Sequence, residues 1–159
     1  MQLLVIRHAV AHDPAPDRDD AARALTDAGK AKLRRAIRGL RALDVHLDRV
    51  LTSPWRRAAQ TARLLAPIAA GEPIATALLT QKPNAELLAL IGGHNDTTAV
   101  VGHEPWLGEL AAWLAFGDCK HGDALRLKKS GVIWLEGTAV PGGMQVCALL
   151  PPKLLRALA

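Results

Sequence analysis

The sequence predicts an α/β fold of three layers, in which helices cover both faces of a mostly parallel central sheet with an antiparallel edge strand. The 159 residues are half apolar and 22% charged, as expected of a globular chain. Short apolar runs alternate with helical patterns over residues 1–115, which favours parallel strands joined by crossover helices. Two strand-like runs joined by a Pro-Gly-Gly turn then close the chain, which is typical of an antiparallel hairpin.

The first third of the chain predicts a buried strand, a polar loop and a long helix. Residues 2–6 are an apolar run that ends at a charged pair. Residues 12–24 are rich in proline and aspartate, which indicates a loop. Thr26 is a candidate N-cap, and the apolar residues that follow it repeat at helical spacing.

The middle third predicts two more strands and one more helix. Residues 49–52 form a second short apolar strand. A helix follows from Pro54 to about Ala66, because proline suits a first helical turn and Ser53 can cap it. Residues 73–79 give a third, weak strand.

The last third predicts two helices around a strong strand, and then the hairpin. Asn84 caps a short helix over residues 84–91, and the β-branched run 97–101 is a strand. In the helix over residues 105–115, Trp106 and Trp113 are seven residues apart, so we expect both in the core. The hairpin strands are residues 132–135 and 144–150, and residues 151–159 form a short helix.

Composition limits the classes of function. Lys plus Arg is 20 and Asp plus Glu is 15, so the net charge is +5, spread along the chain. This suits an anionic partner, but the sequence lacks the basic stripe with interleaved aromatics that nucleic-acid binding favours.

No apolar run reaches the ~18 residues of a membrane span. Cys119 and Cys147 by themselves make neither a disulfide framework nor a zinc site. We expect one cytoplasmic domain over residues 1–159, with no membrane or nucleic-acid partner.

Polar side chains directly follow three of the predicted strands. Arg7-His8 follows the first strand, Ser53 leads from the second toward Arg57, and His103 follows the strand over residues 97–101. In a parallel sheet these strand ends meet at one edge, where ligands bind. Guanidinium groups match phosphate oxygens, and a neutral imidazole among them can attack phosphorus. Taken singly, each feature is ordinary: a surface pair, a helix start, a structural histidine. Their coincidence predicts phosphoryl transfer.

Four segments carry a resemblance to a known family. They are Leu4-Val5-Ile6-Arg7-His8, Leu25-Thr26-Asp27-Ala28-Gly29, Val50-Leu51-Thr52-Ser53-Pro54-Trp55-Arg56-Arg57-Ala58-Ala59-Gln60-Thr61-Ala62 and Val101-Gly102-His103-Glu104-Pro105. In order and spacing the chain resembles the histidine phosphatase superfamily, which has the phosphoglycerate-mutase-like fold. Within it, the chain is most similar to the small SixA-type phosphohistidine phosphatases.

The resemblance implies a role for each matching residue. His8 would be the nucleophile that becomes phosphorylated, and Arg7 and Arg57 would bind the phosphoryl oxygens. His103 would donate to the same oxygens and stabilise the charge of the transition state. The family pattern selects Arg57 over the adjacent Arg56. The start of the helix after Gly102 would add backbone donors near Glu104.

The sequence departs from the family pattern at two points. The glycine that usually follows the nucleophilic histidine is Ala9, for which we expect a slight reshaping and retained activity. The second departure is the general acid, for which Glu86 and Asp13 are candidates, although the SixA-type branch tends to lack this acid. Glu86 also fits a charge in the first turn of a helix, and Asp13 fits a solvated loop residue.

The leading hypothesis is a metal-independent phosphatase, without a cofactor, that dephosphorylates phosphohistidine in proteins. Imidazole leaves phosphorus with less help than an alkoxide, so a missing acid favours phosphohistidine. The alternative is a phosphatase for a small phosphate ester, such as a sugar or nucleotide phosphate, in which Glu86 or Asp13 is essential. A phosphate-reading module without turnover is a third hypothesis. His12, Arg18 and Arg23 lie near the expected site in sequence and are candidates for contact with the substrate or an acidic partner.

Overall fold

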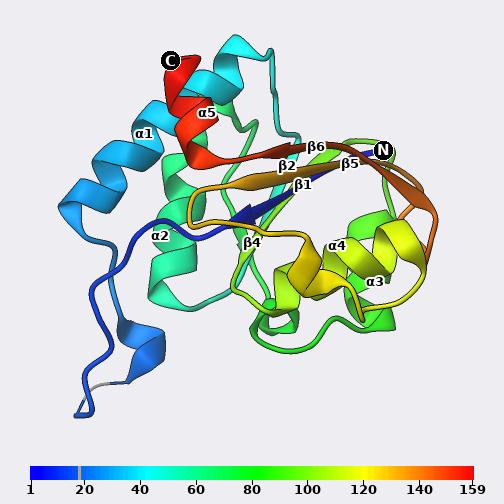
Figure 1. Ribbon diagram of the computed structural model, residues 1–159, viewed down its shortest axis with the longest axis horizontal. Coiled ribbons are helices and arrows are strands. Elements are labelled where there is room, and N and C mark those ends of the chain that lie inside the picture. The colour runs from blue at the N-terminus through cyan, green and yellow to red at the C-terminus, as the bar shows by residue number, and fades with distance from the viewer. Residues whose placement is uncertain (18) are drawn as a thin grey trace.

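A computed structural model, which describes residues 1–17 and 19–159, shows a mixed sheet between two layers of helices (Figure 1). In the described residues the strands are β1 (Gln2–Arg7), β2 (Arg49–Thr52), β3 (Ile74–Ala75), β4 (Thr97–Gly102), β5 (Val132–Gly137) and β6 (Met144–Leu150). The helices are α1 (Asp27–Ala42), α2 (Arg56–Leu64), α3 (Ala85–Gly92), α4 (Trp106–Phe116) and α5 (Pro152–Ala157). A short 3-10 helix, η1, spans Asp20–Ala22 in the loop between β1 and α1.

The strand order β3-β2-β4-β1-β5-β6 places β1 and β4 at the centre of the sheet. β1, β2, β3 and β4 are parallel to one another, whereas β5 runs antiparallel to both β1 and β6. The predicted α/β fold with an antiparallel strand toward one edge is therefore confirmed. In the register of the sheet, Arg7 pairs with Gly102 and Thr52 pairs with Val101. The carboxyl ends of β1, β2 and β4 consequently coincide to within one residue.

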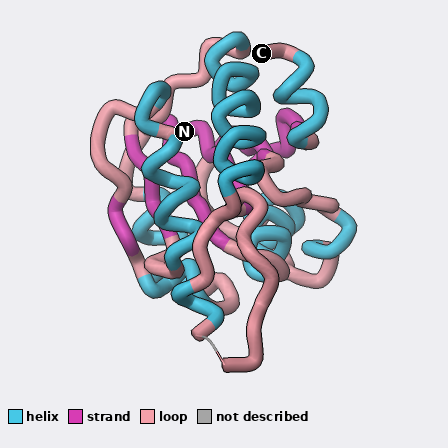
Figure 2. The backbone as a smooth tube through the Cα atoms, turned by 90° about the vertical axis from the view of Figure 1, so that its left-hand side faces the viewer, coloured by secondary structure: helices cyan, strands magenta, loops and turns pink. Residues whose placement is uncertain are grey.

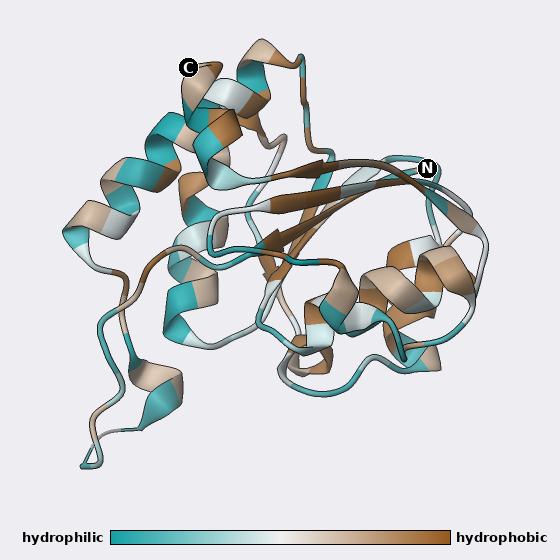
Figure 3. Cartoon of the chain, viewed as in Figure 1, coloured by the Kyte–Doolittle hydropathy of each residue, from teal (hydrophilic) through white to brown (hydrophobic). Residues whose placement is uncertain are grey.

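Alternate residues along the central strands face the two helical layers. Leu4 and Ile6 pack with buried side chains of α1, α2 and α5, while Leu3 and Val5 pack with those of α3 and α4. Figure 2 shows the strands enclosed between these layers, and Figure 3 shows the strands and α4 as strongly apolar. A run that is apolar at every position is what a strand covered on both faces requires.

Two predicted elements differ from the observed ones. Helix α2 begins at Arg56, and its N-cap is Trp55, which makes no side-chain capping bond. The prediction of Ser53 as the cap is wrong, because the Ser53 hydroxyl is engaged elsewhere, as described below. The weak third strand is reduced to Ile74–Ala75, and a 3-10 helix follows it over Ala77–Thr80.

In the described part of the chain, none of the helices combines the length and apolar character needed to cross a lipid bilayer. Cys119 and Cys147 are both free thiols.

Candidate active site

His8 directly follows β1 and is 5% exposed. Its backbone N–H donates to the Gly102 carbonyl at 3.1 Å, which holds the residue against the end of β4. Its Nδ1 lies 2.7 Å from the carbonyl oxygen of Ala9. A carbonyl oxygen only accepts, so Nδ1 carries the proton and Nε2 keeps its lone pair. The bond therefore selects the tautomer in which Nε2 is nucleophilic.

The surroundings of His8 also keep the ring neutral. Burial is the main cause that lowers its pKa from 6.5 to about 4, and the positive charges of Arg57, Arg7 and Lys129 lower it further. The hydrogen bond to Ala9 acts in the opposite direction and is outweighed. At pH 7 the imidazole is consequently uncharged, as a nucleophile must be.

His103 directly follows β4, and its ring centroid lies 5.1 Å from that of His8. The ring is 4% exposed, and its Nε2 lies 3.0 Å from the Ser53 hydroxyl. Its Nδ1 is buried without a hydrogen-bond partner among the described residues. Burial, followed by the charge of Arg57, lowers the pKa of His103 to about 3. Three strand ends thus bring His8, Ser53 and His103 together, as the sequence predicts.

Two tryptophans cover the second histidine. The Trp55 and His103 ring centroids are 4.6 Å apart, and those of Trp106 and His103 are 6.3 Å apart. Trp106 is half-buried and belongs to neither hydrophobic core cluster, so the expectation that it is a core residue is wrong, whereas Trp113 packs against the core as expected. The Trp106 ring also meets Trp55 edge-on at 6.0 Å. One signal in the sequence was available: Trp106 lies only three residues after His103, at the first turn of α4.

The two arginines that the sequence selects share one pattern of contacts. Arg7 Nη1 donates to the Leu127 carbonyl at 2.9 Å, and Arg57 Nη1 donates to the Asp20 carbonyl at 2.7 Å. The Nε atoms of both are buried without a partner among the described residues. Arg57 is 4% exposed while Arg56 is exposed, so the structure turns Arg57 inward, as expected. Each guanidinium is anchored at one end with a buried donor left unpaired.

Thr61 ties the nucleophile segment to α2. Its hydroxyl donates to the Arg57 carbonyl at 2.7 Å and accepts the Ala9 N–H at 3.0 Å. Ala9 itself is fully buried, and its side chain belongs to the core shared with α1 and α2. The methyl group that replaces the usual glycine hydrogen therefore packs in the interior.

Known proteins resemble this chain over nearly its whole length. A sequence model of the histidine phosphatase superfamily (branch 1) matches residues 3–81. An uncharacterized protein of a Picosynechococcus species is 35% identical over 146 residues, which cover 87% of each chain. The structure of the protein histidine phosphatase SixA in complex with tungstate superposes with a TM-score of 0.80 and 25% identity, and the match covers 98% of this chain and 99% of SixA. The chain belongs to the histidine phosphatase superfamily.

More distant histidine phosphatases show the same fold with other named substrates. The α-ribazole phosphatase from Shigella flexneri has a TM-score of 0.73 and 17% identity, over 96% of this chain and 97% of its own. A phosphoserine phosphatase from Entamoeba histolytica, bound to 3-phosphoglyceric acid, has a TM-score of 0.67 and 15% identity, over 97% and 98%. These likenesses establish the fold alone.

Neither candidate acid of this histidine phosphatase contacts the clustered side chains. Glu86 is exposed in the first turn of α3, and Asp13 is exposed in the loop after β1. Within residues 1–17 and 19–159, neither carboxylate forms a hydrogen bond or ion pair with Arg7, His8, Arg57 or His103. Asp20, which no motif in the sequence marks, does reach the cluster, since its Oδ2 accepts from Arg57 Nη2 at 2.9 Å.

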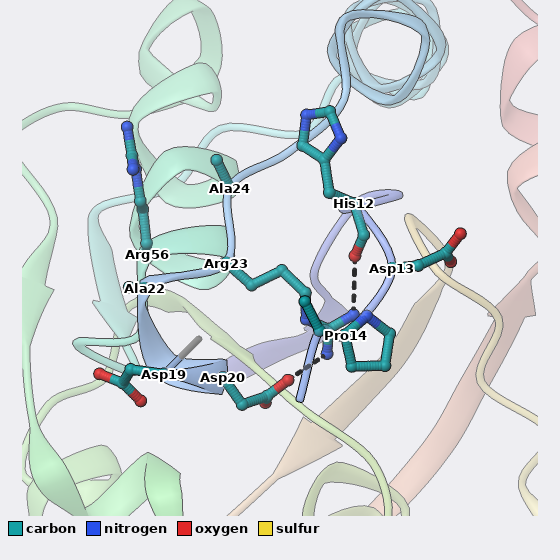
Figure 4. Close-up of a pocket in the computed structure, with 10 residues that line it drawn as sticks. His12, Asp13, Pro14, Asp19, Asp20, Ala22, Arg23, Ala24 and Arg56 are labelled. Atoms are coloured by element: carbon teal, nitrogen blue, oxygen red, sulfur yellow. Dashed lines mark hydrogen bonds and ion pairs between the residues drawn. The ribbon is translucent and has the colours of Figure 1, made fainter. Parts of the chain in front are cut away.

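Asp13 and Asp20 line one cavity of about 180 Å³ beside the cluster. Figure 4 shows Arg23 reaching across this cavity between Asp20 and the carbonyl of His12. His12 is an exposed part of the cavity wall, and Arg18 lies outside the described residues.

Two backbone N–H groups at the start of α4 already have partners. The Leu107 N–H donates to the His103 carbonyl at 3.0 Å, and the Gly108 N–H donates to Glu104 Oε2 at 3.0 Å. Burial raises the pKa of Glu104.

Over the described residues no three His, Cys, Asp or Glu side chains gather as metal ligands.

Proposed function

We propose that residues 1–159 form one histidine phosphatase domain that hydrolyses phosphohistidine in proteins through a phosphorylated His8. Membership of the superfamily supports phosphatase chemistry. The observation that carries the proposal is the gathering of Arg7, His8 and His103 at two strand ends with Arg57 from the first turn of α2, and the lone pair of His8 on Nε2.

In the first step His8 Nε2 forms a bond to phosphorus. The bond between phosphorus and the substrate imidazole nitrogen breaks, and its electron pair stays on that nitrogen, which takes up a proton from solvent. The phosphorylated His8 keeps its Nδ1 proton, so its ring is cationic in the intermediate. In the second step a water oxygen attacks phosphorus, the Nε2–phosphorus bond breaks, and inorganic phosphate is released. The electron pair of the broken bond returns to Nε2, so His8 is neutral again. Both protons of the water leave with the phosphate as H2PO4−, which returns one proton to solvent, so the cycle consumes only water. No metal or cofactor has a part in this proposal.

Unpaired buried donors support a tetrahedral anion as the ligand. Arg7 Nε, Arg57 Nε and His103 Nδ1 are buried without partners among the described residues. Leaving such groups unpaired costs about 1–3 kcal/mol each, more when they are charged. The oxygens of a phosphoryl group would accept from them, and SixA, the similar structure, holds tungstate, another tetrahedral oxyanion. The three donors then stabilise the charge of the transition state.

The choice of phosphohistidine rests on the leaving group. A proton donor typically contributes ~10²–10⁴-fold to expulsion of a poor leaving group. Glu86 and Asp13 are both exposed, and imidazole departs with less help than an alkoxide. The similarity to SixA points the same way. The proposed partner is accordingly a phosphorylated protein.

A small phosphate ester is the second candidate substrate. The α-ribazole and phosphoserine phosphatases with this fold favour it. On this alternative, Asp13→Asn or Glu86→Gln would abolish turnover of an ester.

The test compares turnover of a phosphohistidine peptide with turnover of a panel of sugar and nucleotide phosphates. We expect the peptide to be preferred, His8→Ala to abolish turnover, and His103→Ala to reduce it about 10²–10³-fold. Mass spectrometry of rapidly quenched protein should detect a phosphoryl group on His8. His94→Ala is the matched control, because His94 is exposed and precedes β4 at the opposite end of the strand from His103.

Full activity of the His8→Ala variant would contradict a mechanism through phosphorylated His8. Turnover of a phosphate ester equal to that of the phosphohistidine peptide would contradict phosphohistidine as the preferred substrate. Dialysis against EDTA should leave the rate unchanged, and a lost rate restored by a metal would contradict metal independence.

A further inference from the structure

Asp20 joins the loop after β1 to the buried Arg57. Its backbone carbonyl accepts from Arg57 Nη1 at 2.7 Å, and its Oδ2 accepts from Arg57 Nη2 at 2.9 Å. Its Oδ1 lies 2.9 Å from Nη2 of Arg23. One residue therefore holds both terminal nitrogens of Arg57 and binds a second guanidinium with its remaining oxygen. A buried cation of this kind requires such a partner, because an unpaired charge is costly to remove from water.

The loop that carries Asp20 is itself fixed at several points. Arg23 Nη1 donates to the His12 carbonyl at 3.0 Å, which ties the two sides of the loop together (Figure 4). Ala11 pairs with Leu25 in an isolated antiparallel bridge. The Leu25 N–H donates to Gln60 Oε1 at 2.8 Å, one turn along α2 from Arg57. Asp20 is consequently held in place relative to the helix that bears Arg57.

The bonds to Asp20 leave Arg57 able to bind an anion. A guanidinium has five N–H donors, and Asp20 occupies one on each terminal nitrogen. The buried Nε–H has no partner among the described residues. Asp20 thus fixes the orientation of the guanidinium and leaves the other three N–H donors, the buried Nε–H among them, for phosphoryl oxygens.

The geometry points to Asp20 as a positioning residue for the reaction, which orients Arg57 toward the phosphoryl group and does not transfer a proton. This inference rests on the proposed function. The charges of Arg57 and Arg23 outweigh burial and hold the pKa of Asp20 below its usual value, so the carboxylate stays ionised between two cations. An ionised carboxylate has no proton to give to a leaving group.

The experiment compares Asp20→Asn with wild-type protein, using the phosphohistidine peptide and p-nitrophenyl phosphate as substrates. Misplacing a binding group costs up to about 10²-fold, so we expect kcat/KM to fall about 10- to 100-fold. The fall should be the same for both substrates, because Arg57 contacts the phosphoryl group and not the leaving group. Tungstate binding, measured by calorimetry, should weaken by a similar factor. Asp17→Asn removes an exposed charge from the same loop and serves as the matched control.

A double-mutant cycle with Arg57→Lys separates positioning from a general effect on the loop. If Asp20 acts through Arg57, Asp20→Asn should have little further effect in the Arg57→Lys background. Asp20→Glu keeps the charge and should recover part of the lost activity. Thermal unfolding of each variant reports whether the loop and helix still fold.

Four results would overturn the inference: unchanged rates in Asp20→Asn, tighter tungstate binding, a loss confined to the poorer leaving group, or an undiminished effect in the Arg57→Lys background. Absence of all turnover by the wild-type protein would instead contradict the proposed function. In that case the tungstate titrations still decide the role of Asp20.

Discussion

A single hydrogen bond, from Nδ1 of His8 to the Ala9 carbonyl, decides which nitrogen of the ring is nucleophilic. Because burial and nearby arginines lower the pKa of His8 to about 4, we expect the ring to stay neutral from pH 7 down to pH 5. In ¹⁵N spectra of the imidazole groups, Nδ1 should be protonated and Nε2 unprotonated over this range.

The His8→Gln variant identifies which ¹⁵N resonances belong to His8, because those resonances disappear from its spectrum. A titration midpoint of His8 near the ordinary pKa of ~6.5 would show that the ring is hydrated and free of the surrounding cations. Loss of the Nδ1 proton signal at pH 7 would show that the other tautomer is present.

The type of a residue does not by itself show whether its side chain lies at the site. Arg57 and Arg56 are chemically the same, and the motif selects Arg57, which the fold then buries. Trp106 fits a helix face by its spacing from Trp113, yet its ring lies against His103. The start of α4 projects over the strand ends, and a spacing along one helix carries no information about what lies beyond that helix.

Helix α1 packs closely on α5 through a glycine. A methyl group at Gly39 would overlap the backbone carbonyl of Leu155. Alanine gains up to about 1 kcal/mol of helix propensity over glycine, whereas overpacking against backbone costs about 1–3 kcal/mol. Leu155 is fully buried, so moving α5 away also exposes apolar surface. We therefore expect Gly39→Ala to lower the free energy of unfolding by about 1–2 kcal/mol, measured by urea denaturation.

Gly71→Ala is the matched control, because a methyl group there meets nothing within 4 Å. It should change the free energy of unfolding by less than about 0.5 kcal/mol. A stabilised Gly39→Ala variant would show that α5 shifts at no cost.

The start of α2 shows how the site overrides a local signal. Serine followed by proline is a good helix start, but the Ser53 hydroxyl lies 3.0 Å from His103 Nε2 and accepts the Trp55 N–H at 3.2 Å. The helix consequently begins at Arg56. A capping preference of about 1 kcal/mol is smaller than the cost of leaving a buried imidazole nitrogen unpaired.

Basic residues gather on one layer of the molecule. Helix α1 contains six basic residues and one acidic residue, while α3 and α4 together contain two acidic residues and no basic one. We expect this layer to attract acidic phosphoproteins, because surface potentials raise association rates and are screened by salt. For an acidic phosphohistidine peptide, kcat/KM should fall several-fold as NaCl rises from about 0.05 to 0.5 M.

A neutral phosphohistidine peptide of the same length is the control, and its kcat/KM should change less. Equal salt dependence for both peptides would show that the basic layer does not take part in association.

Acid should destabilise the fold through the two buried histidines. In the unfolded chain they titrate near 6.5, but in the folded protein the pKa values are about 4 for His8 and about 3 for His103. Below pH 6.5 the unfolded state binds protons that the folded state does not bind. The free energy of unfolding is therefore greatest above pH 6.5 and declines toward pH 4. The lowered pKa corresponds to about 3 kcal/mol for His8 and about 5 kcal/mol for His103. Urea denaturation at pH 7, 5.5 and 4.5 measures the decline.

His103→Gln should show a shallower decline over the same range. A free energy of unfolding that stays constant between pH 7 and 4.5 in wild-type protein would contradict the burial of both rings.

Local pattern was sufficient for the order of strands and helices and for the mostly parallel sheet, because apolar periodicity is a property of neighbouring residues. The resemblance to the family then singled out four residues expected at the carboxyl edge of the sheet. Tertiary structure alone decided the partners of those residues. Asp20 reaches Arg57 from 37 positions away, and the Leu127 carbonyl reaches Arg7 from 120 positions away. Such contacts depend on how the loops lie over the folded sheet. Burial at this place lowers the pKa values of His8 and His103 and leaves buried N–H donors without partners.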